Sequence, residues 1–300
     1  DRENYGKFIL TGSSQFAFIK NITETLAGRI GMLTLLPFQK QEIPRSLQGK
    51  QALSGSYPEL INRNYKNTRE WYASYLRNYL ERDVRSLANI VNMRDFQRLI
   101  SLLAARTSQP LNLSTLAKEI GVSVKTVQNW ISVLQASYIV FLLPSYHRNL
   151  GKRIVKRPKL YFYDTGLVCY LTGIRDIEML EKGPLQGEIF ETYVVSEITK
   201  AVFHNDKDAA LYYFRDNLGL EVDLIIEDKA HKRVDFVEIK NSHTPRPQMA
   251  KPLKSFLEGR QKQSVRAYGF VLYKGKSSGK IYKNVNYLNY NQFLENFTYR

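Results

Sequence analysis

Four short apolar segments in the last third of the chain constrain its fold more than any other feature. Residues 211–214, 220–227, 233–240 and 267–273 are rich in the β-branched and aromatic side chains that are typical of β-strands. The segment 228–232 is short and polar, so we predict that the second and third strands form a hairpin. A helical pattern over residues 247–261 separates the third strand from the fourth. These elements predict a sheet combined with helices, as in α/β proteins.

The predicted hairpin carries charged side chains within otherwise apolar strands. Because successive side chains of a strand point to opposite faces, Glu238 and Lys240 share a face of the third strand. Glu221 and Asp223 likewise share a face of the second strand, and we expect the opposite face to carry Val222, Leu224 and Ile226. If the hairpin aligns these positions, three carboxylates and one ammonium group meet on one patch of the sheet.

Carboxylate oxygens at this density suit Mg²⁺, which binds one or two carboxylates, keeps several waters and bridges phosphate oxygens. We predict that Asp223 and Glu238 hold Mg²⁺ and that Lys240 supports the attacking water. Glu191, from a helix predicted over residues 187–201, orients or completes the site. The alternative is a surface sheet in which Lys240 only pairs with Glu238 and Asp223. We favour the site because inward-pointing charge on an apolar hairpin needs a reason.

A second pattern predicts a helix-turn-helix. Residues 113–120 are amphipathic, Gly121 supplies a turn, and Ser123 caps a helix over 124–135. Apolar segments 138–143 and 159–163 then predict the hairpin of a winged helix. The exposed face of the second helix carries short polar and basic side chains that suit base edges and phosphates, namely Ser123, Lys125, Thr126, Gln128 and Asn129. The alternative is a winged helix used only for packing or protein contact.

The basic residues of the chain are clustered. The sequence holds 44 Lys and Arg against 28 Asp and Glu, a net charge of +16. Residues 242–300 contain eleven Lys and Arg but only Glu258 and Glu295 as acids. The predicted wing, residues 145–160, holds six cations and no acid: Arg148, Lys152, Arg153, Lys156, Arg157 and Lys159. This distribution predicts an anionic partner, and DNA rather than a membrane surface.

Several other classes of protein are disfavoured. No apolar run approaches the roughly 20 residues of a membrane helix, so we expect no membrane partner. Cys169 is the single cysteine, which rules out an internal disulfide and favours a cytoplasmic protein. The four histidines lack the spacing of a zinc site.

The start of the chain predicts a strand, helix, strand unit. Residues 7–11 are apolar and end at a turn, a helical stretch runs to about residue 26, and a second apolar strand spans residues 32–36. Residues 56–106 are helical in pattern, with aromatic side chains that we interpret as core. The first residue is Asp1, so we expect the chain to begin inside a longer protein.

Two resemblances extend these predictions. The order Glu191, Asp223 and Glu238-Ile239-Lys240 resembles the PD-(D/E)xK nuclease superfamily. Over nearly the whole chain, the sequence is similar to a family of AAA-type ATP-binding proteins that carry a C-terminal domain of unknown function, number 4143. The similar segments are Phe8–Phe16, Ile22–Ile30, Leu35–Phe38, Gly55–Leu60, Tyr161–Leu167, Gly187–Glu191, Glu221–Asp223 and Glu238–Lys240.

The second resemblance implies a multidomain α/β fold. Residues 1–50 would end an AAA-type P-loop core, 51–108 would form a helical connector, 109–165 a winged helix and 166–300 a PD-(D/E)xK-like domain. Within that core, Ser13 or Ser14 would be the polar sensor of the γ-phosphate, and Arg29 would sense phosphate charge. The family's Gly-rich nucleotide loop and acidic Mg²⁺-binding strand lie upstream of this chain. ATP is therefore expected only in the complete protein.

The leading hypothesis is a nucleotide-dependent factor that acts on DNA, with Mg²⁺ as cofactor if cleavage is retained. The alternative is a regulatory or signalling ATPase whose C-terminal domains bind a protein or nucleic acid without cutting it. A structural assembly module is a third hypothesis, and a homo-oligomer is compatible with all three.

Overall fold

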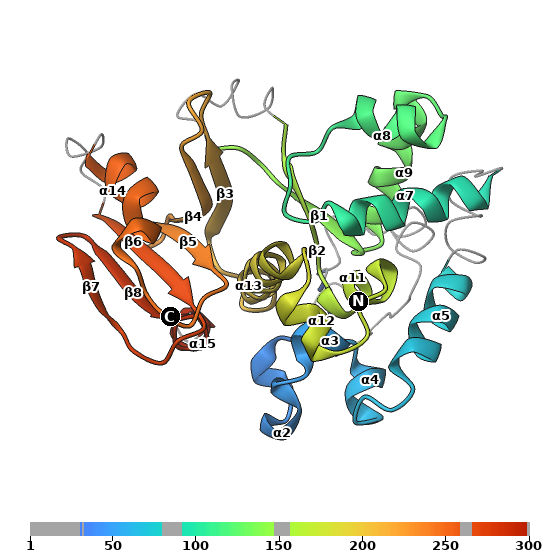
Figure 1. The fold of residues 1–300 in the computed structure, drawn as a ribbon, viewed down its shortest axis with the longest axis horizontal. Coiled ribbons are helices and arrows are strands. Elements are labelled where there is room, and N and C mark those ends of the chain that lie inside the picture. The colour runs from blue at the N-terminus through green and yellow to red at the C-terminus, as the bar shows by residue number, and fades with distance from the viewer. Residues whose placement is uncertain (1–30, 32, 80–91, 147–156, 259–265, 299–300) are drawn as a thin grey trace, which may run out of the picture.

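The computed structural model describes residues 31, 33–79, 92–146, 157–258 and 266–298 (Figure 1). The predicted ATPase core fragment lies largely outside the described residues, together with its three nucleotide-sensing candidates, Ser13, Ser14 and Arg29. Most of the predicted wing also lies outside them, including Arg148, Lys152, Arg153 and Lys156. The strand predicted for residues 32–36 is not formed by residues 33–36, whose expected partner at 7–11 is not among the described residues.

Among the described residues, the larger sheet has six strands in the order β3-β4-β5-β6-β8-β7. The strands β3 to β5 form an antiparallel meander, which confirms the predicted hairpin. The chain then passes through η3 (Pro247–Ala250) and α14 (Lys251–Glu258) into β6, which is parallel to β5. The strand bounds are Ala209–Arg215 for β3, Glu221–Asp228 for β4, Arg233–Lys240 for β5, Arg266–Tyr273 for β6, Gly279–Tyr282 for β7 and Val285–Asn289 for β8.

Helices cover both faces of this sheet (Figure 1). The long helix α13 (Gln186–His204) and the final helix α15 (Tyr290–Thr298) pack on one face, where Val194 and Phe293 share a core with Val237. Helix α14 covers the other face, where Leu253 packs in a second cluster with Phe236. Because helices cover both faces, β4 and β5 are buried along most of their length, although both strands carry charged residues.

A β-bulge in β4 changes the predicted alternation of its side chains. Tyr212 of β3 pairs with Ile225, but Phe214, two residues on, pairs with Val222, three residues back. Val222 therefore packs in the cluster under α14, whereas Leu224 and Ile226 pack under α13. The prediction that Val222 shares a face with Leu224 and Ile226 is wrong, because the extra residue of a bulge shifts one part of a strand relative to the other.

A second, mainly helical unit surrounds a small hairpin. Helices α8 (Leu113–Ile120) and α9 (Val124–Ala136) confirm the predicted helix pair. Gly121 adopts a φ of 85°, and the Ser123 side chain accepts from Thr126 N, as predicted for the turn and the cap. The hairpin is antiparallel and consists of β1 (Val140–Leu143) and β2 (Lys159–Phe162).

One core joins these elements to their helical neighbours. It runs from Leu60 to Ile189 and includes both strands of the hairpin. The divisions at 108/109 and 165/166 remain predictions, since the same core packs residues from both sides of each. The other elements of this half are η1 (Lys40–Glu42), α2 (Arg45–Gln48), α3 (Gln51–Ser54), α4 (Pro58–Asn62), α5 (Thr68–Tyr79), α7 (Met93–Ala105), α11 (Thr165–Thr172) and α12 (Ile177–Lys182).

Backbone hydrogen bonds attach the hairpin unit to the large sheet. Tyr213 N of β3 donates to Pro144 O at 3.0 Å, and Tyr146 N donates to Tyr213 O at 2.6 Å. These bonds hold β2 beside α13 and the start of β4, and so bring side chains of both units together. None of the helices in the described part of the chain has the length and hydropathy needed to cross a bilayer.

Candidate functional site

The predicted residues of the hairpin meet where β4 begins and β5 ends. Asp223 and Glu238 are both buried, with side-chain exposures of 10% and 6%. Ile239 N donates to Asp223 Oδ2 at 2.8 Å, which fixes the Asp223 carboxylate across the two strands. Lys240 Nζ lies 2.5 Å from Glu238 Oε1 and 4.0 Å from Asp223 Oδ2. The structure therefore brings Asp223, Glu238 and Lys240 together.

The surface-sheet alternative would have the same ion pairs, but its carboxylates would be exposed to solvent. Both carboxylates are inside the molecule, and only Lys240 is open to solvent, with 37% of its side chain exposed. Among the described residues, Glu238 Oε2 is buried without a hydrogen-bond partner. A buried carboxylate oxygen without a donor is costly, because burial removes its water without replacing it.

Glu191 of α13 joins this group from the helical side. Its Oε1 accepts from Tyr161 Oη at 2.6 Å and lies 3.0 Å from Lys159 Nζ. Lys159 Nζ also lies 2.6 Å from Glu221 Oε1 and 4.0 Å from Asp223 Oδ1. Together, Glu191, Glu221, Asp223, Glu238, Lys159, Lys240 and Tyr161 are called the carboxylate site below.

Lys159 and Tyr161 were not predicted as site residues. The sequence places Lys159 among the cations of a solvent-exposed wing, and that interpretation is wrong, because only 3% of the side chain is exposed. Lys159 is the first residue of β2, all four residues of which are buried. A lysine that opens an otherwise apolar strand is a signal for a buried partner, but the sequence does not reveal which carboxylates lie opposite.

Burial and mutual repulsion shift the pKa values of the carboxyl groups. Burial, with a further contribution from Asp223, raises the pKa of Glu238 to about 8. The same causes raise the pKa of Glu191 to about 7. Burial alone would lower the pKa of Lys240, but Asp223 and Glu238 outweigh it and raise the pKa above the ordinary value. Burial likewise opposes the charge on Lys159, but Glu191, Asp223 and Glu221 outweigh it and raise its pKa. Both ammonium groups are therefore charged at neutral pH, while the carboxyl groups compete for protons.

A small divalent cation fits the Glu238 side of the site. Asp223 and Glu238 offer oxygen donors, and one of these, Glu238 Oε2, has no other partner in the described structure. No group of three or more His, Cys, Asp or Glu side chains within the described ranges is arranged to hold a metal. Two carboxylates are nevertheless the usual protein share for Mg²⁺, which fills its remaining positions with water and phosphate.

The predicted DNA-binding residues of α9 lie on one side of that helix. Lys125, Gln128 and Asn129 are exposed, whereas Thr126 is half-buried and its Oγ1 lies 2.8 Å from Ser123 Oγ. The opposite side of α9 is core, with Val127, Trp130 and Ile131 buried. Arg157, the other wing cation among the described residues besides Lys159, is exposed, and its carbonyl oxygen accepts from Tyr213 Oη.

Two of the similar segments have a structural role. Asp164 caps α11, and its carboxylate accepts from Leu167 N, Tyr72 Oη and Ser56 N at 2.6 to 2.7 Å. Gly55 has a φ of 91°, and a Cβ there would lie 2.0 Å from Tyr72 Oη. The segments Gly55–Leu60 and Tyr161–Leu167 thus meet in a tightly packed, fully hydrogen-bonded contact.

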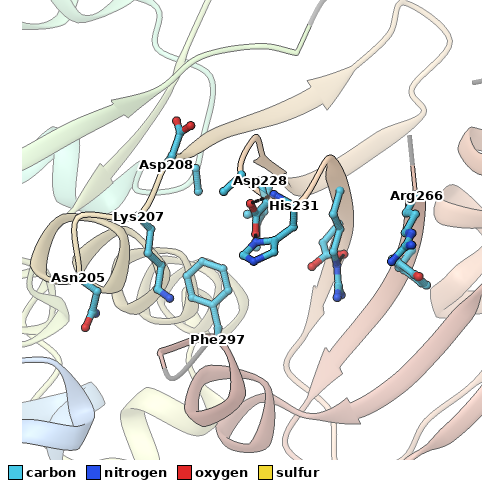
Figure 2. A pocket seen from close by; sticks show the side chains of 13 residues that line it. Asn205, Lys207, Asp208, Asp228, His231, Arg266 and Phe297 are labelled. Atoms are coloured by element: carbon cyan, nitrogen blue, oxygen red, sulfur yellow. Dashed lines mark hydrogen bonds and ion pairs between the residues drawn. The ribbon is translucent and has the colours of Figure 1, made fainter. Parts of the chain in front are cut away.

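A separate pocket of about 480 Å³ lies at the opposite end of β4 and β5 (Figure 2). His231 Nδ1 lies 2.9 Å from Asp228 Oδ2, and Arg233 Nε lies 2.6 Å from Asp235 Oδ1. The Arg233 guanidinium also stacks 4.6 Å from the Tyr268 ring centroid. These charges are satisfied by one another, and the pocket contains none of the predicted site residues.

Known proteins match this chain in two consecutive parts. Residues 46–178 match a family model described as domain of unknown function DUF8612. Uncharacterized proteins from Mycobacterium bovis and Mycobacterium tuberculosis are each 28% identical over 240 residues, which cover 80% of this chain. The chain spans about half of their length, 53%. Neither family description names an ATPase, so the link to AAA-type proteins stays a prediction.

The second match covers most of the carboxylate site. Residues 186–293, from the start of α13 into α15, match the model of domain of unknown function DUF4143. Lys159 and Tyr161 lie in the DUF8612 range, and Glu191, Glu221, Asp223, Glu238 and Lys240 lie in the DUF4143 range. The carboxylate site is therefore shared by two regions, of which the second carries the similarity to DUF4143 that the sequence motifs predicted.

Proposed function

We propose that residues 186–293 act as a nuclease-like domain whose carboxylate site binds a divalent cation, and that the complete protein acts on DNA. The observation that carries the proposal is the buried Glu238 Oε2, which has no hydrogen-bond partner among the described residues and lies beside a second buried carboxylate, Asp223. Such a group is unfavourable in an empty structural site, whereas a cation stabilises it.

The order of elements supports the same proposal. Helix α13 carries Glu191, the antiparallel strands β4 and β5 carry Asp223 and Glu238, and α14 follows. This is the order of helix, acidic hairpin and following helix on which the resemblance to PD-(D/E)xK nucleases rests. A cation held there would polarise a phosphate and lower the pKa of a bound water.

The residues of this chain would then act as follows. Asp223, which Ile239 N holds in place, and Glu238 would bind the divalent cation. Glu238 must release a proton to do so at neutral pH. Lys240 stays charged and half-exposed, so its ammonium group is available to hold a water or a phosphate oxygen. Glu191 does not face solvent freely, because it accepts from Tyr161 and Lys159.

Cleavage assays on plasmid and single-stranded DNA test the nuclease part. With Mg²⁺ or Mn²⁺ present, we expect cleavage by the wild type and a loss of at least about 100-fold in Asp223→Asn, which removes a charge aimed at the cation. The matched control is Asp228→Asn, at the other end of the same strand, where the carboxylate pairs with His231. Equal activity in wild type and Asp223→Asn would contradict the proposal.

The DNA-binding part rests on the exposed side of α9 and on the net charge of +16. Phosphate contacts predict a steep fall in log K with log[salt], and loss of one contact lowers the slope by about one. We expect Lys125→Ala to produce that change in duplex binding and Lys182→Ala, on the exposed side of α12, to leave the slope unaltered. A flat salt response in the wild type would instead favour a protein partner.

The regulatory alternative remains distinguishable. A chain that binds DNA with the expected salt dependence but cuts neither substrate would support a regulatory or signalling protein without cleavage. The ATPase activity of a longer protein, with Ser13, Ser14 and Arg29 as phosphate sensors, is a separate proposal that rests on sequence similarity alone.

A further inference from the structure

We infer that Lys159 permanently fills one of two cation positions around Asp223, so that the carboxylate site takes a divalent ion only on the Glu238 side. The inference rests on the metal site proposed above and specifies how many ions that site can hold. Lys159 reaches the site from the hairpin unit and has almost no exposed side-chain surface.

Asp223 presents a cation to each of its two oxygens. Its Oδ1 lies 4.0 Å from Lys159 Nζ, and its Oδ2 lies 4.0 Å from Lys240 Nζ. Each ammonium group also has its own carboxylates, which are Glu191 and Glu221 for Lys159, and Glu238 for Lys240. A carboxylate that bridges two cations is the arrangement by which two-metal sites hold their ions. In this chain, both positions are within reach of an ammonium group.

The two ammonium groups differ in whether they can leave. Lys240 is at the end of β5 with 37% of its side chain exposed, so it can turn into solvent when a cation binds. The side chain of Lys159 is only 3% exposed, and Lys159 itself pairs with Leu143 of β1 in the hairpin. The ring of Tyr213 lies 5.6 Å from Lys159 Nζ and covers it further. Withdrawal of Lys159 would require the start of β2 to separate from Glu191 of α13 and Glu221 of β4.

An ammonium group supplies charge but cannot act as a metal. It neutralises Glu191 and Glu221 at N–O distances of 3.0 and 2.6 Å, and those oxygens are then unavailable as metal ligands. It offers no open coordination position for water or phosphate. Lys159 is therefore a positioning residue that limits the site to one divalent ion and ties that ion's environment to the hairpin unit.

Metal stoichiometry tests this inference on the full 300-residue chain. Calorimetric titration with Mn²⁺, together with electron paramagnetic resonance of the bound ion, counts the sites and detects ion–ion coupling. Lys159→Ala should bind one more Mn²⁺ than the wild type and show coupled ions, since Glu191 and Glu221 become ligands. The double variant Lys159→Ala, Glu221→Gln should lose the added ion, and Lys159→Arg should match the wild type.

The same stoichiometry in Lys159→Ala and wild type would overturn the inference. A wild type without any bound Mn²⁺ would refute the metal site proposed above, and a gain of one ion in Lys159→Ala would still support the inference. If the variant is less stable, its thermal midpoint should rise more on addition of Mn²⁺ than the midpoint of the wild type. An equal rise in both, repeated in Lys159→Met, would count against a cation position at Lys159.

Discussion

Two of the buried acidic clusters in the described structure, around Asp164 and in the carboxylate site, differ in how their oxygens are satisfied. Around Asp164, both carboxylate oxygens accept hydrogen bonds, from Ser56 N to one and from Tyr72 Oη and Leu167 N to the other. In the carboxylate site, Glu238 Oε2 has no partner among the described residues. Both carboxylates are buried, but their hydrogen bonding differs. Every oxygen of Asp164 has a donor, whereas Glu238 Oε2 gains a partner only when a ligand or a proton binds.

A third buried acid follows the Asp164 pattern. Glu197 Oε1 accepts from Gln51 Nε2 at 2.9 Å, and its Oε2 accepts from Lys40 N at 2.7 Å. Its neighbour Lys200 pairs with the same carboxylate and donates to Phe38 O. Burial of charge alone is therefore a poor guide to function in this fold, and the unsatisfied oxygen is the feature that separates the carboxylate site from both other clusters.

The largest expected effect is on the packing of the Asp164 cluster. Gly55→Ala should lower the free energy of unfolding by about 3–5 kcal/mol, because a Cβ would meet Tyr72 Oη at 2.0 Å at a φ of 91°. Gly121→Ala is the matched control, with a φ of 85° but nothing within 4 Å of its Cβ, and should cost about 1 kcal/mol. Urea unfolding measures both. Equal losses would show that backbone strain, not the contact, is decisive.

A smaller loss of stability, on substitution of Asp164 itself, distinguishes the Asp164 cluster from an ordinary helix cap. Asp164→Asn keeps a capping oxygen but turns an amide donor toward Ser56 N, so we expect a loss of about 2–4 kcal/mol. Asp176 caps α12 at an exposed position, through Met179 N at 2.8 Å. Because Asn caps about as well as Asp, Asp176→Asn should change stability by less than about 0.5 kcal/mol. Similar changes in the free energy of unfolding for the two variants would show that Asp164 acts only as a helix cap.

The smallest expected effect is the pH dependence of the carboxylate site without metal. The pKa of Glu238 is raised to about 8, above the value of an unfolded glutamate, so the folded state retains a proton that the unfolded chain releases. That stability is fully present below the unfolded pKa and is lost as the pH rises through about 8. Between pH 6 and 8.5, the free energy of unfolding should fall by about 1–3 kcal/mol more in the wild type than in Glu238→Gln.

Its control is Glu258→Gln, at the exposed end of α14, which should keep the fall seen in the wild type. Urea unfolding at several pH values in the presence of a chelator makes the comparison. If wild type and Glu238→Gln have parallel pH profiles, Glu238 does not hold the proton. The carboxylate site would then resemble the Asp164 cluster.

The sequence predicts local features of this fold better than contacts between its units. Helices α8 and α9, the Ser123 cap and the β4–β5 hairpin follow from spacing and turn residues close together in the chain. The bulge in β4 cannot be predicted from the sequence, because it arises from the pairing of β4 with β3. Apolar residues point to both faces of β4, so the sequence pattern does not show where the alternation shifts. Strand β7 is partly exposed and β8 is mostly half-buried, and neither has a strong apolar pattern.

The carboxylate site shows the same limit. Asp223, Glu238 and Lys240 lie on the two strands of one hairpin, so the local pairing of β4 with β5 brings them together. Lys159 is 64 residues before Asp223 and reaches it only because Tyr213 attaches the hairpin unit to β3. That placement depends on tertiary packing, which no local pattern in the sequence encodes.

Proton release on metal binding tests the central claim most directly. Calorimetric titration of Mg²⁺ or Mn²⁺ into the wild type at pH 7, in two buffers of different ionisation enthalpy, reports both the affinity and the number of protons released. We predict binding with release of about one proton, because Glu238 must ionise to accept the ion, and loss of both signals in Glu238→Gln but not in Glu258→Gln. Binding that is the same in Glu238→Gln, or no binding to the wild type, would contradict a divalent-cation site at Asp223 and Glu238.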